Sequence, residues 1–132
     1  MGNIRISVKL SNPLKDNLAA SETVALVDTG SLNLCLPSFL AIRLGLRELE
    51  KRDVIVADGR KVLCSYSGPI LVEYGDRRCY TGALILGDEV ILGTIPLEDM
   101  DLIIHPASQT VVPNPETPEL PTVLGKDYIP PG

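Results

Sequence analysis

The 132-residue chain is long enough for one domain with a core of ordinary size. Its formal net charge of −5 at pH 7 argues against nucleic acid as a partner, because a phosphate backbone attracts basic surfaces. Apolar residues make up 45% of the chain but aromatic residues only 4%, so the core must be built from Val, Ile and Leu. These side chains favour strands, and we expect a mainly β protein.

The cysteines and the histidine do not form a metal-binding pattern. Cys35, Cys64 and Cys79 lie far apart in the sequence, and only His105 could add a nitrogen ligand, so we expect no metal and no cofactor. No apolar run approaches the ~20 residues that cross a bilayer, and the first residues lack the apolar segment of a secretion signal. We therefore expect a cytoplasmic protein that has no membrane partner.

Two predicted strands lead into an acidic turn. Residues 4–10 alternate between apolar and polar side chains, which is typical of a half-buried strand. A polar loop follows over residues 11–17. Residues 23–27 are apolar or β-branched, which predicts a central strand with both faces covered. The strand ends at Asp28, where the pattern would otherwise continue with an apolar residue.

Asp28 and its neighbours are the first candidate functional residues. An ionised carboxylate at the end of a buried strand costs on the order of several kcal/mol, so we expect it to be paired, hydrogen-bonded or partly protonated. Thr29 offers a hydroxyl group, and Gly30 lacks a Cβ atom and so lets backbone N–H groups approach the carboxylate. The same residues also fit a plainer interpretation, in which Asp28 only caps a tight turn.

A short strand and a short helix are predicted next. Residues 32–36 alternate as in a strand. Residues 37–45 begin with proline and end with glycine, which is typical of a short helix. Residues 48–52 are charged, and we expect them to be solvated.

Two hairpins are predicted in the middle of the chain. Asp58-Gly59 lies between two β-rich runs in residues 54–64, which is a strong signal for a hairpin turn. Gly75-Asp76 gives a second turn between the β-rich residues 70–74 and 78–86. Taken alone, the first of these is an ordinary surface hairpin.

A strand that ends in glycine precedes the second predicted helix. Residues 90–92 are apolar, and Gly93 after them permits close packing of backbone on backbone. Residues 94–100 are predicted to form a helix that Thr94 caps. The helix residues that we expect to face inward are Leu97 and Met100.

The end of the chain differs in composition from the rest. Residues 101–105 and 110–112 are predicted as two last strands, with His105 as a turn residue. Six of the eleven prolines lie in the final twenty residues. We therefore divide the chain into a domain of residues 1–112 and an extended or disordered tail of residues 113–132. Such a tail could also sit in a peptide-binding cleft, as an inhibitor or a processing site.

The string Asp28-Thr29-Gly30-Ser31, preceded by an apolar strand, resembles the catalytic loop of aspartic proteases. Ile91-Leu92-Gly93 before a short helix is similar to the strand that forms one arm of a ψ-shaped structure against that loop. Pepsin-like enzymes carry two such acidic strings in one chain and this sequence carries one, so it looks like a retropepsin-like (retroviral-type) protease, especially the small bacterial and archaeal members. The resemblance implies an all-β, closed β-barrel-like acid-protease fold with one lobe per chain and one or two short helices.

The resemblance also implies a function. The chain would be an aspartic endopeptidase active as a homodimer, in which two Asp28 side chains share a proton and activate water to hydrolyse a peptide or protein substrate. In each chain Thr29 and Gly30 complete the catalytic loop, and the hairpin at Asp58-Gly59 would cover the substrate. The substrate-binding residues that the resemblance implies are Ser31, Ala57, Asp58 and Gly59.

Some positions depart from the retroviral pattern. Those enzymes often have an acid two places after the catalytic glycine and an arginine after the apolar-apolar-glycine motif, which help to tie the dimer together; here these positions are Leu32 and Thr94. The tip at Asp58-Gly59 is also less glycine-rich. One alternative is therefore a non-catalytic dimerisation or peptide-binding module on the same fold, and another is an unrelated small β-barrel with Asp28 far from any symmetry mate.

Overall fold

The computed structural model describes residues 3–132. Nine strands and two short helices make up its regular secondary structure, which confirms the prediction of a mainly β protein. The strands are β1 (Ile4–Ser11), β2 (Ser21–Val27), β3 (Leu34–Leu36), β4 (Arg47–Ile55), β5 (Lys61–Tyr74), β6 (Arg77–Ile85), β7 (Val90–Leu92), β8 (Leu102–His105) and β9 (Thr110–Pro113). The helices are α1 (Ser38–Arg43) and α2 (Thr94–Asp99), and neither helix of the described residues is long and apolar enough to span a membrane.

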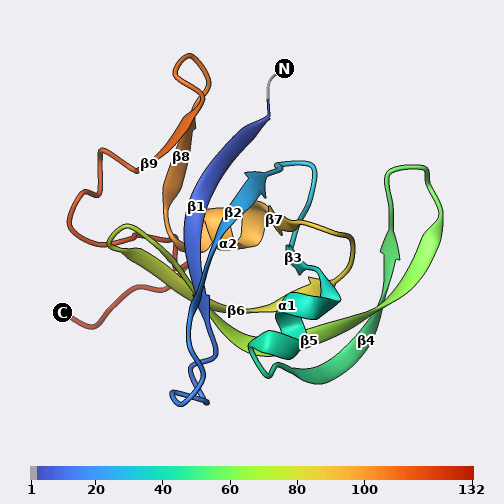
Figure 1. The fold of residues 1–132 in the computed structure, drawn as a ribbon. Helices are drawn as coiled ribbons and strands as arrows, with labels where there is room; N and C mark the ends of the chain where they lie inside the picture. Colours follow the sequence, from blue (N-terminus) through green and yellow to red (C-terminus); the bar gives the residue numbers. More distant parts are fainter. Residues whose placement is uncertain (1–2) are drawn as a thin grey trace.

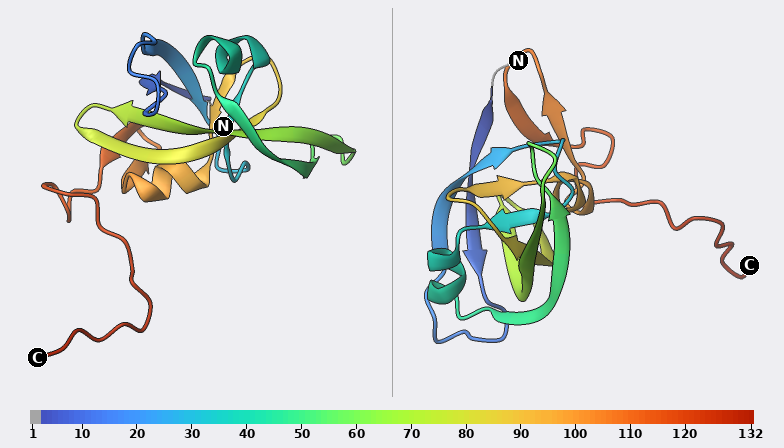
Figure 2. Two further views of the ribbon diagram at one scale, coloured as in Figure 1. Left: turned by 90° about the horizontal axis from the view of Figure 1, so that it is seen from below. Right: turned by 90° about the vertical axis from the view of Figure 1, so that its right-hand side faces the viewer.

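Seven strands form one sheet that curls into a barrel (Figure 1). Their order is β1-β2-β7-β3-β6-β5-β4, and a further pairing of β1 with β5 over Lys9–Ser11 closes the ring. β4 remains outside this ring and pairs with β5 as a long hairpin that extends from one side of the barrel (Figure 2). β8 and β9 form a separate two-stranded sheet.

The core is aliphatic, as the composition predicted. Along β1 the apolar residues turn inward and the polar ones outward, because successive side chains of a strand point to opposite faces. Leu97 of α2 and Met100, the C-cap residue of this helix, are both buried as predicted. The fully buried aliphatic side chains come from most of the barrel strands and include Leu10, Leu34, Leu36, Ile70 and Leu92.

Two predictions about strands were wrong in part. The prediction that both faces of residues 23–27 are covered fails at Val24, which is 57% exposed. The reason is that β2 lies in the single-layered wall of a barrel, whose outer face meets solvent. Residues 48–51 are exposed as predicted, whereas Arg52 is half-buried, and all five belong to β4, which pairs with β5.

Two element boundaries also differ from the prediction. The strand predicted over residues 32–36 is limited to β3, because the chain at Leu32 still belongs to the loop after Asp28. The prediction that Thr94 caps α2 was wrong. Gly93 is the N-cap residue and makes no side-chain cap, and Thr94 is the first helical residue.

Asn12 is a buried polar residue that connects the β1–β2 loop to the end of α1. Its Nδ2 atom donates to the carbonyl oxygens of Leu44 and Gly45 at 3.0 and 3.2 Å, and its Oδ1 accepts from the Leu14 N–H at 2.9 Å. These bonds satisfy carbonyl groups at the end of the helix that have no helical partner.

We expect Asn12→Ala to lower the free energy of unfolding by about 1–3 kcal/mol, because it leaves buried backbone groups without partners. Urea unfolding at neutral pH measures the change. Asn17→Ala, at an exposed position of the same loop, is the matched control and should change the stability by less than about 0.5 kcal/mol. An Asn12→Ala protein as stable as this control would contradict the assignment.

A buried arginine joins the start of β6 to the end of α2 and to the tail. Arg77 is 2% exposed. Its Nη1 atom donates to the carbonyl oxygens of Met100 and Asp101 at 3.0 and 3.4 Å, and its Nη2 atom donates to the carbonyl oxygen of Thr117. The guanidinium group also lies 4.0 Å from the Asp101 carboxylate. The buried charge is thus neutralised and hydrogen-bonded, as such a group requires.

Asp101 fastens the first part of the tail. Its carboxylate accepts hydrogen bonds from Asn114 Nδ2 at 3.1 Å, from the Thr122 N–H at 3.0 Å and from the Thr117 hydroxyl group. Residues 114–132 contain neither helix nor strand. The segment up to Thr122 is nevertheless held on the body of the protein.

The same hydrogen bonds predict an acid-dependent loss of stability. Those from Thr117, Thr122 and Asn114, with Thr117 contributing most, lower the pKa of the Asp101 carboxyl group. Its contribution is therefore fully present above the unfolded-state pKa of about 3.9 and is lost as the pH falls through the lower folded-state value. In urea unfolding between about pH 2.5 and pH 7, the wild type should lose stability below about pH 4 more steeply than Asp101→Asn. Parallel curves for the two proteins would contradict this.

Candidate active site

The loop after β2 is held in place by the strand that lies beside it. β7 runs parallel to β2 and antiparallel to β3, so it lies between the two strands that the loop connects. The Asp28 N–H donates to the Leu92 carbonyl oxygen at 3.1 Å, and the Thr94 N–H donates to the Ser31 carbonyl oxygen at 3.0 Å. The loop is therefore bonded at both ends to the junction of β7 and α2. This is the ψ-shaped arrangement that the resemblance implied.

Gly93 allows this close approach. A Cβ atom at this position would lie 2.5 Å from the carbonyl oxygen of Asn33 and 2.7 Å from the carbonyl carbon of Leu32. Both atoms belong to the backbone and cannot move aside as a flexible side chain could. The predicted packing of backbone on backbone at Gly93 is confirmed.

Asp28 is a half-buried carboxylate in a tight turn. Its Oδ1 atom accepts a hydrogen bond from the Gly30 N–H at 2.9 Å, and the Ser31 N–H donates to the Asp28 carbonyl oxygen at 3.1 Å. The predicted approach of a backbone N–H to this carboxylate is therefore confirmed. Thr29 is exposed beside it.

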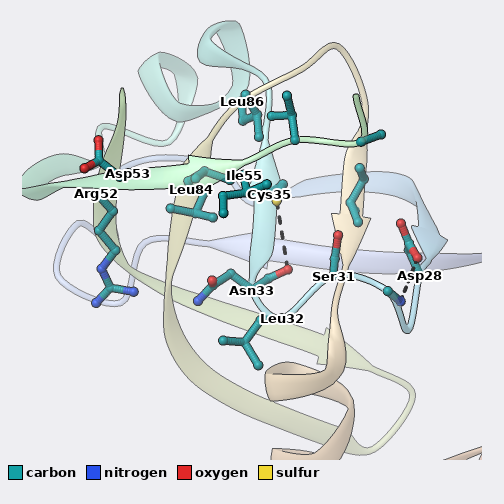
Figure 3. Close-up of a pocket in the computed structure, with 15 residues that line it drawn as sticks. Asp28, Ser31, Leu32, Asn33, Cys35, Arg52, Asp53, Ile55, Leu84 and Leu86 are labelled. Carbon is teal, nitrogen blue, oxygen red and sulfur yellow. Dashed lines mark hydrogen bonds between the residues drawn. The ribbon is translucent and has the colours of Figure 1, made fainter. Parts of the chain in front are cut away.

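A cleft of about 790 Å³ begins at Asp28 and runs under the β4–β5 hairpin. Figure 3 shows Asp28 and Ser31 at one end of the pocket and Arg52 and Asp53 at the other. Its walls are mostly apolar, and Asn33 and Cys35 also line it. The apolar lining residues are Leu32, Val54, Ile55, Val56, Ala57, Leu84, Leu86 and Ile91. A cleft with apolar walls and a few polar groups is typical of a binding site.

The predicted substrate-binding residues do not all line the cleft. Ser31 and Ala57 do, whereas Asp58 and Gly59 are not among its lining residues. Asp58 instead bonds to Arg60, by its Oδ2 atom to the guanidinium Nε at 2.7 Å and by its Oδ1 atom to the backbone N–H at 3.0 Å. Gly59 has a φ of 88°, which suits its place in the hairpin turn.

Asp28 also borders a second hollow, of about 340 Å³. Thr29 lines this hollow and not the cleft. The remaining walls come from the start of β1, the end of β2 and the β8–β9 hairpin, through Asn3, Ile4, Val27, Ile104, Pro106 and Gln109. The carboxylate thus stands where two separate concave surfaces meet.

Sequence reasoning missed Arg52 as a cleft residue because it treated residues 48–52 as a solvated segment, and it gave no role to Asp53. The signal was the two-residue alternation of a strand, which places Arg52 on the same face as Val54 and Val56. The Arg52 guanidinium carbon lies 3.7 Å from the centre of the Tyr66 ring, and its Nε atom pairs with Glu50 at 2.8 Å. Arg52 is thereby held in place at the far end of the cleft.

Cys35 lies on the cleft wall as a protonated thiol. Burial raises the pKa of this thiol to about 11, and Cys64 and Asp28 nearby add to the shift. At pH 7 it is therefore a poor nucleophile. Among residues 3–132, no three His, Cys, Asp or Glu side chains gather in a way that could hold a metal ion.

No protein-family model and no curated protein sequence matches the chain. Among solved structures, it is similar to EIAV protease in complex with the inhibitor HBY-793, with a TM-score of 0.57 and 20% identity, over 75% of this chain and 88% of that one. A retropepsin-like aspartic protease from Rickettsia conorii matches with a TM-score of 0.44 and 18% identity, over 70% of this chain and 68% of that one. The likeness to EIAV protease, together with the closed barrel, shows that this chain has the retropepsin-like aspartic protease fold.

Proposed function

We propose that the protein is an aspartic endopeptidase that is active as a homodimer, in which each chain supplies one Asp28. The observation that carries the proposal is the position of this carboxylate. It stands in a tight loop at the meeting point of an apolar cleft and a second hollow. The cleft offers room for a peptide, and the second hollow offers a surface for another chain. The retropepsin-like fold supports the same assignment.

The chemistry needs two carboxyl groups close together. Two Asp28 side chains in contact cannot both be ionised, so they share one proton. The ionised carboxylate takes a proton from water as the water attacks the scissile carbonyl carbon, and the protonated partner donates to the carbonyl oxygen. The Gly30 N–H holds Oδ1 of each carboxylate at 2.9 Å and so fixes its orientation. We assign Thr29, which is exposed beside Asp28, to the contact between the two loops.

The β4–β5 hairpin would act as a cover for the bound peptide. Ala57 already faces the cleft, and Asp58 and Gly59 at the turn would reach the substrate backbone when the hairpin closes. Closure would exclude water and strengthen the electrostatic interactions at the carboxylates. Ser31 lies at the Asp28 end of the cleft, where it would contact the peptide near the scissile bond.

Exposed apolar residues beside the loop support a dimer. Leu32 is 62% exposed and Ile95 is 39% exposed, and the Ile95 N–H donates to the Leu32 carbonyl oxygen at 2.8 Å. Leu32 stands at the position where retroviral enzymes often have an acid that helps to tie the dimer, and Ile95 follows Thr94, which stands at the position of their arginine. An apolar contact across the two-fold axis would replace those charges and would release water from both surfaces.

A dilution experiment tests the homodimer. The rate of hydrolysis of an unfolded protein substrate per subunit should follow the dimer fraction measured by sedimentation at the same concentrations. The reason is that a monomer holds only one of the two carboxyl groups. Full activity at concentrations where the protein is monomeric would contradict the proposal.

The alternative function is a peptide-binding module that performs no hydrolysis. The apolar cleft supports it equally well, since binding needs the walls and not the carboxylate pair. A stable dimer that binds peptides but does not hydrolyse them between about pH 3 and pH 8 would favour the module.

For either function we propose a cytoplasmic location, because the three cysteines are present as buried thiols.

A further inference from the structure

The tail leaves the body of the protein at a defined point. Asn114, Thr117 and Thr122 bond to Asp101, and Thr117 also accepts from the buried Arg77. After Thr122 the chain runs away from the barrel, on the side opposite the β4–β5 hairpin (Figures 1 and 2). The fastened segment therefore determines where the last ten residues start.

The residues after this point are unusually apolar for an exposed segment. Leu124 is 99% exposed and Ile129 is 86% exposed, and Val123 and Tyr128 are also mostly exposed. Apolar side chains in water favour any surface that can cover them. The segment has no helix or strand, and a backbone hydrogen bond within it joins the Tyr128 N–H to the Gly125 carbonyl oxygen at 3.3 Å. When this turn opens, the backbone groups of the segment can pair with another chain.

The cleft has the complementary character. Its walls are apolar at Leu84, Leu86 and Ile91, and it carries one positive and one negative side chain, Arg52 and Asp53, at its far end. The tail likewise carries one positive and one negative residue, Lys126 and Asp127, between its apolar residues. An extended strand in the cleft would place alternate side chains against the apolar walls and could pair these charges with those of the cleft.

We propose that residues 123–129 are a built-in ligand for the active-site cleft of another molecule of the same protein. The tail binds there as an extended strand and competes with substrate, so activity is restrained when the protein is concentrated. Binding occurs between molecules because the tail starts on the side away from its own hairpin. The inference rests on the proposed function in one respect, namely that the cleft binds extended peptides.

Three full-length proteins test the inference through activity. Leu124→Asp places a charge on the most exposed apolar residue of the tail. Leu14→Asp makes the same change at a position that is 74% exposed in the β1–β2 loop and is the matched control. At about 50 µM protein, we expect Leu124→Asp to hydrolyse substrate at least about threefold faster per subunit than the wild type and the control. The difference should vanish on dilution, because the restraint is intermolecular.

A binding measurement tests the inference without activity. The probe is a fluorescein-labelled peptide of residues 122–132. The receptor is full-length protein carrying Asp28→Asn, so that it does not hydrolyse the probe, and Leu124→Asp, so that its own tail competes less with the probe for the cleft. We expect saturable binding by fluorescence anisotropy, weakened at least about tenfold when the peptide itself carries Leu124→Asp. No saturation, or equal binding of both peptides, would overturn the inference.

The outcomes separate this inference from the proposed function. If the wild type and Leu124→Asp hydrolyse substrate equally at every concentration, the tail is not a ligand of the cleft, while the endopeptidase assignment stands. If the peptide binds as expected but no protein hydrolyses any substrate, the docking of the tail stands and the endopeptidase assignment fails.

Discussion

Asp28→Asn is expected to lower peptide hydrolysis by about 10⁴-fold or more while the fold and the dimer persist. The substitution removes both carboxyl groups of the proposed pair at once, so no group remains to take a proton from water or to donate one to the scissile carbonyl oxygen. The amide oxygen of asparagine can still accept the hydrogen bond that the Gly30 N–H now donates to Asp28 Oδ1. The loop should therefore keep its geometry.

The measurement compares initial rates on an unfolded protein substrate with thermal unfolding and sedimentation of the same samples. Asp76→Asn is the matched control, because Asp76 is an exposed carboxylate in the β5–β6 turn and does not line the cleft. It should retain wild-type activity. Hydrolysis by Asp28→Asn at more than about a hundredth of the wild-type rate would rule out the proposed chemistry.

Gly93→Ala is expected to lower the free energy of unfolding by about 3 kcal/mol, near the upper end of the usual cost of overpacking. The added methyl group would meet the Asn33 carbonyl oxygen at 2.5 Å and the Leu32 carbonyl oxygen at 2.8 Å. Relief requires that the loop move away from β7. Such a movement would break the bonds that hold Asp28 and Ser31 to the junction of β7 and α2.

Activity should therefore fall together with stability. Urea unfolding measures the stability, and hydrolysis under conditions in which the protein remains folded measures the activity. Gly132→Ala is the control for the loss of glycine itself, since a Cβ atom there has no neighbour within 4 Å. A Gly93→Ala protein as stable and as active as this control would show that the close approach is not needed.

Local signals in the sequence predicted most of the elements. The alternation in β1, the Asp-Gly turn between β4 and β5 and the inward Leu97 and Met100 each depend on residues within one turn or one strand. The same holds for the Gly30 N–H that approaches Asp28, because both residues belong to a single tight turn. Such features need no knowledge of distant contacts.

The contacts between distant segments could not be predicted in this way. Periodicity and turn residues do not indicate that β7 inserts between β2 and β3 or that β1 pairs with β5, and only the resemblance to a known fold implied a ψ-shaped structure and a closed barrel. These pairings join residues far apart in the chain and are decided by the packing of the whole domain. Arg77 is the clearest case, because a basic residue in a turn-like stretch gave no sign that it would be buried.

The buried Arg77 also connects the barrel to residues beyond position 112. By composition the chain would be divided at residue 112, and a shorter version ending there would lack Thr117, Asn114 and Thr122. The guanidinium group would lose one of its carbonyl partners, and the Asp101 carboxylate would lose its hydrogen-bond donors. Loss of residues 123–132 should therefore cost little free energy of folding, whereas loss of the proline-rich stretch before them should destabilise the barrel.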